Sequence, residues 1–332
     1  HGTIRVPGDK SISHRSIMLG AIAEGRTEVT GFLEGADALS TMNAFRALGV
    51  SIDGPAAGRV GIGGVGLHGL RAAPGPLDCG NAGTAMRLMM GLLAGQRFES
   101  VLIGDESLSK RPMRRVADPL ALMGARIETQ DGRPPVRILP VPTLNGIRYE
   151  MPVASAQVKS ALLLAGLYAQ GETTVVEPAP TRDHTERMLG GFGVELERDG
   201  AAVTLRGGQR LQAATIDVPA DISSAAFFLV GAAICPGAEL RLEHVGMNPT
   251  RTGVVDILRL MGADLVAENP REVGGEPVAD LVVRGGGLRG IEIPPALVPL
   301  AIDEFPALFV AAACAEGRTV LTGAEELRVK ES

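Results

Sequence analysis

Apolar segments with a helical period recur along the chain, and several of them end in the same way. Four close on a glycine that is followed by a β-like run, in RALGVSI, ALMGARI, GGFGVEL and RLMGADL. The equivalent glycines are spaced 75, 69 and 69 residues apart, at Gly49, Gly124, Gly193 and Gly262. A glycine in this place is typical of the C′ residue that ends a helix. The pattern therefore predicts a structural repeat of about 70 residues.

A second glycine series supports the repeat, because each member ends a helical pattern and a strand pattern follows. Its members are Gly25, Gly95, Gly171, Gly237 and Gly317. One unit then reads strand, helix, strand, helix, strand, strand, an alternation that favours parallel pairing and an α/β fold. The predicted units cover residues 1–75, 76–146, 147–214 and 215–287. A fifth begins near Leu288 and stops at Ser332 before its second helix, so we expect a missing C-terminal part.

The first helix begins in a polar octapeptide, Gly8-Asp9-Lys10-Ser11-Ile12-Ser13-His14-Arg15. It lies between a strand-like run, Thr3 to Val6, and an apolar helical pattern, Ile17 to Ala23. Free backbone N–H groups and the helix dipole make such a place suitable for a phosphate or carboxylate. The alternative is a serine cap with solvated charges.

Other predicted helices also begin in polar clusters, so the arrangement is repeated. If the units pack about a common axis, these helix N-termini lie on one side and form a positive cleft for a small, multiply charged anion. The clusters are Asp78 to Thr84 with Arg87, Lys110-Arg111-Pro112, Ser155 to Lys159, Thr181 to His184, Asp221 to Ser224, Asn248 to Arg251 and Asp303-Glu304.

Composition excludes several classes of protein. The net charge of −6, the absence of Trp and the presence of only two Tyr argue against a nucleic-acid partner. Three distant cysteines and no clustered histidines predict a cytoplasmic protein without a protein-held metal. The uncharged run Ile222 to Ala238 is interpreted as a buried helix and strand, not a membrane span.

Two glycine-rich matches to the dinucleotide fingerprint do not predict NAD binding. They begin at Gly61 and Gly285, and each leads into a proline-containing stretch where the fingerprint requires a helix. No nucleotide-binding lysine loop of the G-x-x-x-x-G-K-[ST] type occurs either.

Several polar residues have both a structural and a functional interpretation. Gly83 could give a ligand room or could supply a positive φ. Pro112 fits the first turn of a helix, but four positive charges around it, at Lys110, Arg111, Arg114 and Arg115, oppose the helix dipole and point to an anion. Asp183 and Glu186 have the spacing of a capping pair.

Taken together, the motifs of this sequence resemble one family, 5-enolpyruvylshikimate-3-phosphate synthase, and within it the bacterial branch often called class II. The resemblance runs in order from the first strand to Ser332, which makes it specific. The matching segments are GDKSISHR, GNAGTAMR, GDESLSKRPM, ASAQVKSALLLAGL, TRDHTE, NPTRTG and LRVKES.

The resemblance implies a two-domain enolpyruvyl transferase fold of repeated βαβαββ units, an inside-out α/β barrel with its last unit missing from this chain. It places residues 8–217 in a domain of three units. Residues 1–7 and 218–332 then belong to a second domain, incomplete at its C-terminus. The active site of this family lies between domains that close over the substrates.

The implied reaction moves the carboxyvinyl group of phosphoenolpyruvate to the 5-hydroxyl of shikimate 3-phosphate and releases phosphate. It needs no cofactor. By motif, Lys10 contacts both substrates, Asp303 is the base for the 5-hydroxyl, and Glu331 exchanges a proton at carbon. Shikimate 3-phosphate would be held by Lys10, Ser11, Arg15, Ser155, Ala156, Gln157, Arg182, Asp303 and Lys330. Phosphoenolpyruvate would be held by Lys10, Asn81, Gly83, Arg111 and Gln157.

The resemblance leaves two alternatives open. The family motif continues beyond Ser332 with an Asp-Arg pair, a His-Arg pair and a lysine, so a non-catalytic anion-binding fragment is one. The other is the sister transferase acting on UDP-N-acetylglucosamine, which has Lys-Asn where this chain has Lys10-Ser11 and typically uses a loop cysteine. We also expect a monomer, no nucleic-acid or membrane partner, and competitive inhibition by glyphosate.

Overall fold

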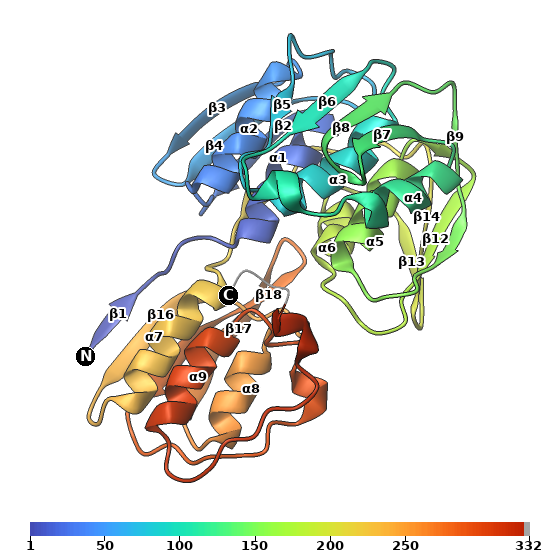
Figure 1. The fold of residues 1–332 in the computed structure, drawn as a ribbon. Coiled ribbons are helices and arrows are strands. Elements are labelled where there is room, and N and C mark those ends of the chain that lie inside the picture. Colours follow the sequence, from blue (N-terminus) through green and yellow to red (C-terminus); the bar gives the residue numbers. More distant parts are fainter. Residues whose placement is uncertain (329–332) are drawn as a thin grey trace. The chain divides into compact units, whose positions relative to one another are not determined.

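The structure, a computed structural model, describes residues 1–328 and divides them into two compact units. The larger unit is Lys10–Asp217. The smaller unit combines residues 1–9 with the described residues from Val218 onward. Both units are layered, with helices packed on one side of their sheets (Figure 1).

Within the described residues, the larger unit contains three four-stranded sheets with one topology. In each sheet the first two strands in the spatial order pair in parallel, and the remaining pairings are antiparallel. The first sheet has the spatial order β15 (Thr215–Asp217), β2 (Glu24–Thr30), β4 (Arg59–Val65), β3 (Ser51–Ala56). The second has the order β5 (Leu77–Asp78), β6 (Ser100–Ile103), β8 (Arg133–Leu139), β7 (Arg126–Gln130). The third has the order β10 (Arg148–Glu150), β12 (Glu172–Val176), β14 (Ala202–Arg206), β13 (Leu196–Asp199). A short parallel pair, β9 (Leu144–Asn145) with β11 (Ala169–Gln170), is added to them.

Two helices accompany each sheet of the larger unit. They are α1 (Lys10–Ile22), α2 (Ala36–Ala47), α3 (Gly83–Ala94), α4 (Arg114–Leu122), α5 (Ala156–Gly166) and α6 (His184–Gly191), with a short 3-10 turn η1 (Leu108–Lys110). Of the second predicted glycine series, Gly95 ends a helix, as the C-cap residue of α3. The prediction is wrong for Gly25, which lies inside β2, and for Gly171, which lies between β11 and β12.

The predicted C′ glycines are confirmed in both units. Gly49, Gly124, Gly193 and Gly262 all have a positive φ, between 83° and 95°. After α2, for example, the Gly49 N–H donates to Arg46 O at 3.0 Å, and the Val50 N–H donates to Phe45 O at 3.1 Å. The same pair of hydrogen bonds follows α4, α6 and α8 (Gly253–Leu260), so one helix-ending motif is used four times.

The smaller unit has one four-stranded sheet with the same topology as the other three. Its spatial order is β1 (Gly2–Ile4), β16 (Glu239–Gly246), β18 (Glu276–Arg284), β17 (Asp264–Val273). Helices α7 (Ile222–Ile234), α8 (Gly253–Leu260) and α9 (Phe305–Cys314) pack with it. The 3-10 turns of this unit are η2 (Pro295–Leu297) and, at the end of the described residues, η3 (Glu325–Arg328). The expected fifth unit consists here of α9 flanked by two single-residue parallel bridges, Arg289 with Glu316 and Glu292 with Val320.

For two of the predicted 70-residue units, 1–75 and 215–287, the first strand belongs to a different sheet from the rest of the unit. β1 pairs in parallel with β16, and β15 pairs in parallel with β2. The first strand along the chain therefore completes the fourth unit, and the strand at Thr215–Asp217 completes the first. A periodic pattern identifies a strand but not its partner, because partner choice depends on contacts distant in sequence.

Helices α3 and α5 cross so closely that a glycine is required between them. A Cβ on Gly91 would lie 2.0 Å from the Ala161 carbonyl oxygen on α5, so any larger residue would force the two backbones apart. The facing side chains of both helices are almost all fully buried. This close packing holds the first turns of α3 and α5 beside each other.

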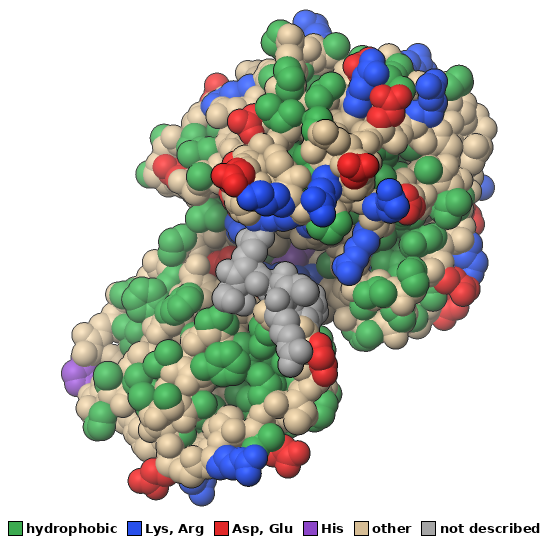
Figure 2. Space-filling model, viewed as in Figure 1, with side chains coloured by type: hydrophobic (Ala, Val, Ile, Leu, Met, Phe, Trp, Pro, Cys, Tyr) green, Lys and Arg blue, Asp and Glu red, His purple; other side chains and the backbone are tan. Residues whose placement is uncertain are grey.

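Within the run from Ile222 to Ala238, residues Ile222–Ile234 form helix α7, and strand β16 begins only after the run, at Glu239. The prediction that this run is buried is wrong for one face of the helix. Phe227 and Phe228 are 65% and 47% exposed, and on α9 Phe309 and Val310 are about half exposed. Figure 2 shows this face of the smaller unit as an area of mostly apolar side chains.

Candidate active site

The N-terminus of α1 carries three of the predicted substrate residues. Lys10 is the first residue of the helix, and its exposed Nζ lies 3.2 Å from Asp37 Oδ2 on α2. An exposed ion pair of this kind contributes little, so an anion can compete for the lysine. Ser11 is half-buried beside it.

Arg15 lies one turn further along α1 and is almost fully buried. Its guanidinium donates to Thr185 Oγ1 at 2.7 Å and to Ser160 Oγ at 3.2 Å, and also to the Ser11 carbonyl. Arg15 therefore connects α1 with α5 and α6. Its role as a direct ligand for shikimate 3-phosphate stays a prediction.

The turn before α3 brings together two residues that are 30 positions apart. Arg111 Nη2 donates to Asn81 Oδ1 at 2.6 Å, and Asn81 Nδ2 donates to Asp105 Oδ2 at 2.7 Å. Hydrogen bonds from the Leu108 N–H and from Asn81 hold the pKa of Asp105 below its ordinary value. The carboxylate therefore stays charged and keeps Asn81 oriented toward Arg111.

Gly83 is the first residue of α3 and is buried among cationic groups. A Cβ at this position would lie 3.1 Å from Arg111 Nη1 and 3.3 Å from Arg87 Nη1. The φ of Gly83 is outside the positive range, so the interpretation that it serves the backbone conformation is wrong. Two guanidinium groups instead converge on its open face, at the positive end of a helix dipole.

The first turn of α5 carries Ser155, Ala156 and Gln157. Ser155 is the N-cap, and its Oγ accepts from the Val158 N–H at 3.3 Å. Gln157 reaches across to α3, where its Oε1 accepts from Arg87 Nη1 at 2.7 Å and its Nε2 donates to Thr84 Oγ1 at 2.9 Å. The expectation that helix N-termini lie on one side is therefore met for α3 and α5. In Figure 2, Lys and Arg side chains gather along one rim of the larger unit.

Arg87 belongs to one of the predicted polar clusters, but the sequence analysis assigned it to neither substrate. It links Gln157 with the Pro112 carbonyl, which accepts from Arg87 Nη2 at 3.1 Å. Its position four residues after Gly83 on the same helix is the signal that could have identified it.

Pro112 itself precedes α4, which begins at Arg114, so its expected place in the first helical turn is wrong. The chain there is held by side-chain contacts to α3.

Arg182 lies in the loop between β12 and α6, half-buried. The predicted capping pair at the start of α6 is wrong, because the Asp183 side chain makes no cap hydrogen bond. Asp183 Oδ1 accepts instead from Arg187 Nε at 2.9 Å, and Glu186 Oε1 lies 2.6 Å from Lys159 Nζ. A cationic partner attracts a carboxylate more strongly than a backbone N–H does.

The remaining predicted residues belong to the smaller unit. Asp303 is half-buried and directly precedes Glu304, the N-cap residue of α9. Lys330 and Glu331 lie outside the described residues. Next to Asp303, the buried Arg251 guanidinium lies 3.1 Å from Asp9 Oδ2, 3.2 Å from Asp221 Oδ1 and 3.8 Å from Glu304 Oε1. Burial alone would lower the pKa of Arg251, but these carboxylates raise it above its ordinary value.

Further features of residues 1–328 concern metal sites, membrane-spanning helices, the cysteines and the glycine-rich matches. No group of three or more His, Cys, Asp or Glu side chains in this range could hold a metal ion, and no helix there is long and apolar enough to cross a membrane. Burial, with a smaller effect of Asp78, raises the pKa of the Cys79 thiol to about 12, so it is a poor nucleophile. The glycine-rich matches lie on and after strands, at β4 and behind β18, and open no helix.

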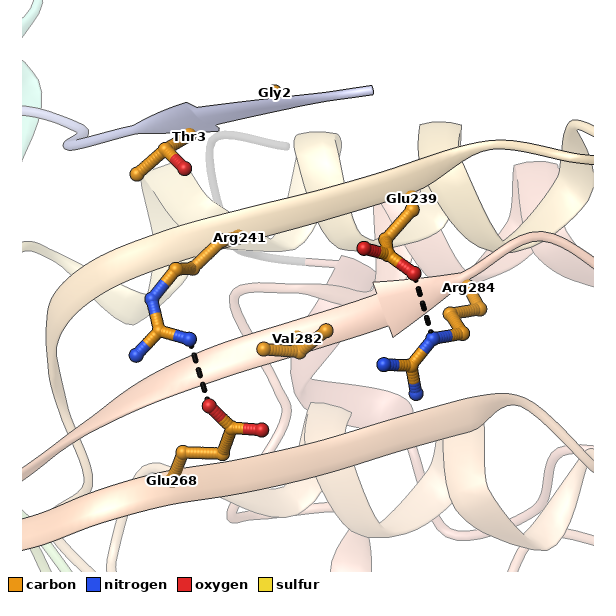
Figure 3. A pocket seen from close by; sticks show the side chains of 7 residues that line it. All are labelled: Gly2, Thr3, Glu239, Arg241, Glu268, Val282 and Arg284. Atoms are coloured by element: carbon orange, nitrogen blue, oxygen red, sulfur yellow. Dashed lines mark hydrogen bonds and ion pairs between the residues drawn. The ribbon is translucent and has the colours of Figure 1, made fainter.

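A hollow on the outer face of the β1–β16–β18–β17 sheet contains four charged side chains (Figure 3). Arg241 Nη1 lies 2.7 Å from Glu268 Oε2, and Arg284 Nε lies 2.8 Å from Glu239 Oε2. These charges neutralise one another on a largely exposed surface. The hollow therefore lacks the excess positive charge found at the helix N-termini.

The family model for EPSP synthase (3-phosphoshikimate 1-carboxyvinyltransferase) matches residues 1–332. The chain belongs to the EPSP synthase family. A 3-phosphoshikimate 1-carboxyvinyltransferase from Alkalilimnicola ehrlichii is 71% identical over 332 residues, which are all of this chain and 74% of that protein. The protein of the same name from Methylococcus capsulatus is 68% identical, over all of this chain and 76% of that protein.

Solved structures of the EPSP synthase family agree with the fold. The structure of EPSP synthase from Acinetobacter baumannii matches with a TM-score of 0.94 and 63% identity, over all of this chain and 75% of that chain. The mixed α/β architecture of repeated sheets and helices is therefore that of EPSP synthases, as the motifs predicted.

Proposed function

We propose that this chain catalyses the EPSP synthase reaction, the transfer of the carboxyvinyl group of phosphoenolpyruvate to the 5-hydroxyl of shikimate 3-phosphate. A C–O bond forms between the 5-oxygen and C2 of phosphoenolpyruvate while C3 gains a proton. C3 then loses a proton, and the bond from C2 to the phosphate oxygen breaks, releasing phosphate. The observation that carries the proposal is the cluster of Arg87, Arg111, Asn81 and Gln157 around Gly83 at two helix N-termini.

The roles within this cluster follow from its charge. Arg111 and Asn81, with Gly83 leaving space and Gln157 alongside, would hold phosphoenolpyruvate, an anion suited to guanidinium groups and a helix N-terminus. Ser11, Arg15, Ser155, Ala156, Gln157 and Arg182 would hold shikimate 3-phosphate. Lys10 would contact both substrates, because it combines exposure with the first position of α1.

Proton transfer would be the task of the smaller unit. Asp303 would accept the 5-hydroxyl proton, Glu331 would exchange the proton at C3, and Lys330 would contact shikimate 3-phosphate. Positioned acid and base groups typically supply about 10²–10⁴ in rate. The rest would come from cationic groups that stabilise the charged intermediate.

Inhibition, assembly and location belong to the same proposal. Glyphosate should compete with phosphoenolpyruvate near Gly83. We expect a monomer in the cytoplasm; the three cysteines, all free thiols in the structure, suit a reducing compartment.

The test is release of phosphate from phosphoenolpyruvate by the complete protein, with EDTA present and without NAD. We expect release only when shikimate 3-phosphate is added. Lys10→Met should lower kcat/KM by about 10–150-fold, the value of one charge-assisted contact. Arg210→Met, an equal charge change at a 76% exposed side chain paired with Glu24, should leave it within about threefold. Metal-dependent turnover, or turnover with UDP-N-acetylglucosamine, would contradict the proposal.

A further inference from the structure

Lys159 is the one lysine of the larger unit that is fully buried, in contrast with the exposed Lys10 and Lys110. The sequence placed it in the polar cluster that opens α5, but its side chain turns into the interior. Its Nζ lies 2.9 Å from Glu177 Oε1 and 2.6 Å from Glu186 Oε1. Burying a charge of this kind is costly unless it is well paired, and Lys159 is paired with two carboxylates.

The two carboxylates differ in what their second oxygens do. Glu177 follows β12, and its Oε2 accepts from the Thr181 N–H at 2.9 Å and from Thr181 Oγ1 at 2.5 Å. Glu186 lies in the first turn of α6, and its Oε2 has no hydrogen-bond partner among the described residues. Only Glu177 therefore connects the lysine to the loop between β12 and α6.

Thr181 directly precedes Arg182, the loop residue proposed to lie near the phosphate of shikimate 3-phosphate. Lys159 lies one turn after Ser155 on α5, and its N–H donates to the Ser155 carbonyl at 3.1 Å. One continuous chain of contacts thus runs from the Ser155–Gln157 turn through Lys159 and Glu177 to the residue before Arg182. A second cation, Arg198, lies 3.5 Å from Glu177 Oε1 and 3.4 Å from Glu186 Oε1 and balances the charge.

We propose that Lys159 and Glu177 are positioning residues that hold the Arg182 loop against the start of α5, and that they thereby set the affinity for shikimate 3-phosphate. Neither residue needs to contact a substrate. The proposal rests on the proposed function, since it assigns Arg182 and the α5 turn to that substrate.

The experiment compares Glu177→Gln with Glu186→Gln in the complete protein. Both variants remove one carboxylate from Lys159 Nζ and leave it the other. A glutamine at 177 has an oxygen at only one of the two positions, that of Oε1 beside Lys159 or that of Oε2 beside Thr181, and the other position becomes an NH₂ donor that cannot accept. A glutamine at 186 leaves the link to Thr181 intact. Calorimetric titration with shikimate 3-phosphate, kinetic constants for both substrates and thermal unfolding are measured for each.

We expect Glu177→Gln to raise the dissociation constant and KM for shikimate 3-phosphate about tenfold, the effect of about one hydrogen bond. The KM for phosphoenolpyruvate and kcat should stay within about threefold. Glu186→Gln should leave all of these within about threefold, while the two variants unfold at similar temperatures. Equal weakening of shikimate 3-phosphate binding by both variants, or none by Glu177→Gln, would overturn the proposal.

If Glu177→Gln does not fold, Thr181→Val replaces it, because this change removes only the hydroxyl bond to Glu177 and no charge. It should weaken shikimate 3-phosphate binding about threefold or more, and unchanged binding would overturn the proposal. Absence of any turnover by the unsubstituted protein would instead count against the proposed function, which keeps the two failures distinct.

Discussion

Gly83 shows how much a single missing side chain can matter at the positive end of a helix. Its neighbours on the open side are the guanidinium groups of Arg111 and Arg87, at 3.1 and 3.3 Å from where a Cβ would be. These distances are shorter than ordinary van der Waals contact. A methyl group would therefore displace the two groups that we propose to surround phosphoenolpyruvate.

Gly83→Ala should raise the glyphosate inhibition constant by more than it raises the KM for phosphoenolpyruvate. Glyphosate is the longer molecule, and crowding by one added carbon costs about 1–3 kcal/mol, or roughly 5–150-fold. Steady-state inhibition constants for both versions of the complete protein decide the matter. An equal rise in both parameters, or an unsubstituted protein already indifferent to millimolar glyphosate, would contradict this expectation.

Asp303→Asn tests the proposed base, because it preserves shape and removes the ability to take a proton. We expect kcat to fall by roughly 10²–10⁴ while shikimate 3-phosphate still binds. Rapid-quench kinetics and a binding titration measure the two effects separately. A kcat within about threefold of the unsubstituted value would make the assignment wrong.

At the scale of elements, one carboxylate organises the sheet of the smaller unit. Asp280 on β18 faces bulges in both neighbouring strands, at Leu242–Val245 in β16 and Glu268–Arg271 in β17. His244 and Asn269, both with a positive φ, lie in these bulges and donate to it, through the His244 N–H at 2.9 Å and Asn269 Nδ2 at 3.0 Å. Arg241 Nη2, at 3.0 Å, adds a charged donor.

These contacts make the stability of the sheet dependent on pH. Burial alone would raise the pKa of Asp280, but hydrogen bonds from Asn269, the His244 N–H, Arg241 and Arg271 outweigh it and hold the pKa well below its ordinary value. A carboxyl whose pKa is lower in the folded state stabilises that state above its unfolded pKa of about 4. The contribution is lost progressively as the pH falls below that value.

Asp280→Asn should therefore lower the free energy of unfolding at pH 7 by about 1.5–3 kcal/mol, the value of hydrogen bonds to a charged group. The difference from the unsubstituted protein should shrink below about pH 4. Urea unfolding at pH 7 and pH 3 measures both effects. Asp264→Asn, in the exposed part of β17, is the control and should change stability by less than about 0.5 kcal/mol. A difference that is the same at both pH values would contradict the assigned cause.

At the scale of the whole molecule, two sheets are closed by strands far apart in sequence: β1 pairs with β16 in the smaller unit, and β15 pairs with β2 in the larger unit. The chain also crosses between the two units twice, after Asp9 and after Asp217. The two crossings run side by side within the smaller unit. There the Asp9 N–H donates to Pro219 O at 2.8 Å, and the Asp221 N–H donates to Pro7 O at 2.9 Å. Neither sheet is complete until strands more than 180 residues apart in sequence have paired.

Removal of residues 1–6 should therefore affect the smaller unit and not the helix α1 that follows in sequence. The N–H groups of β16 opposite β1 should exchange with solvent about tenfold faster, while those of β2 keep their protection. Hydrogen exchange followed by mass spectrometry locates the change. Ile216→Pro, in β15, is the reciprocal variant and should expose β2 but not β16. Faster exchange in β2 after removal of residues 1–6 would contradict the observed pairing.

Local features were predictable from the sequence because they depend on neighbouring residues. The helix ends at Gly49, Gly124, Gly193 and Gly262 follow from a positive φ that glycine adopts easily. The N-cap Ser155 of α5 follows from the local capping preference of serine. The family motifs are short segments, and the repeat and the α/β class follow from the recurrence of such segments along the chain.

Only the tertiary structure decided what depends on distant partners. Gln157 could be identified as a candidate, but its bonds to Arg87 and Thr84 exist because Gly91 allows α3 and α5 to approach. Glu186 has the spacing of a cap, yet it pairs with Lys159, since a buried ammonium group attracts a carboxylate more strongly than a backbone N–H does. The sequence by itself thus determined which residues could begin a helix or meet an anion. The packing of segments far apart along the chain decided which of them meet.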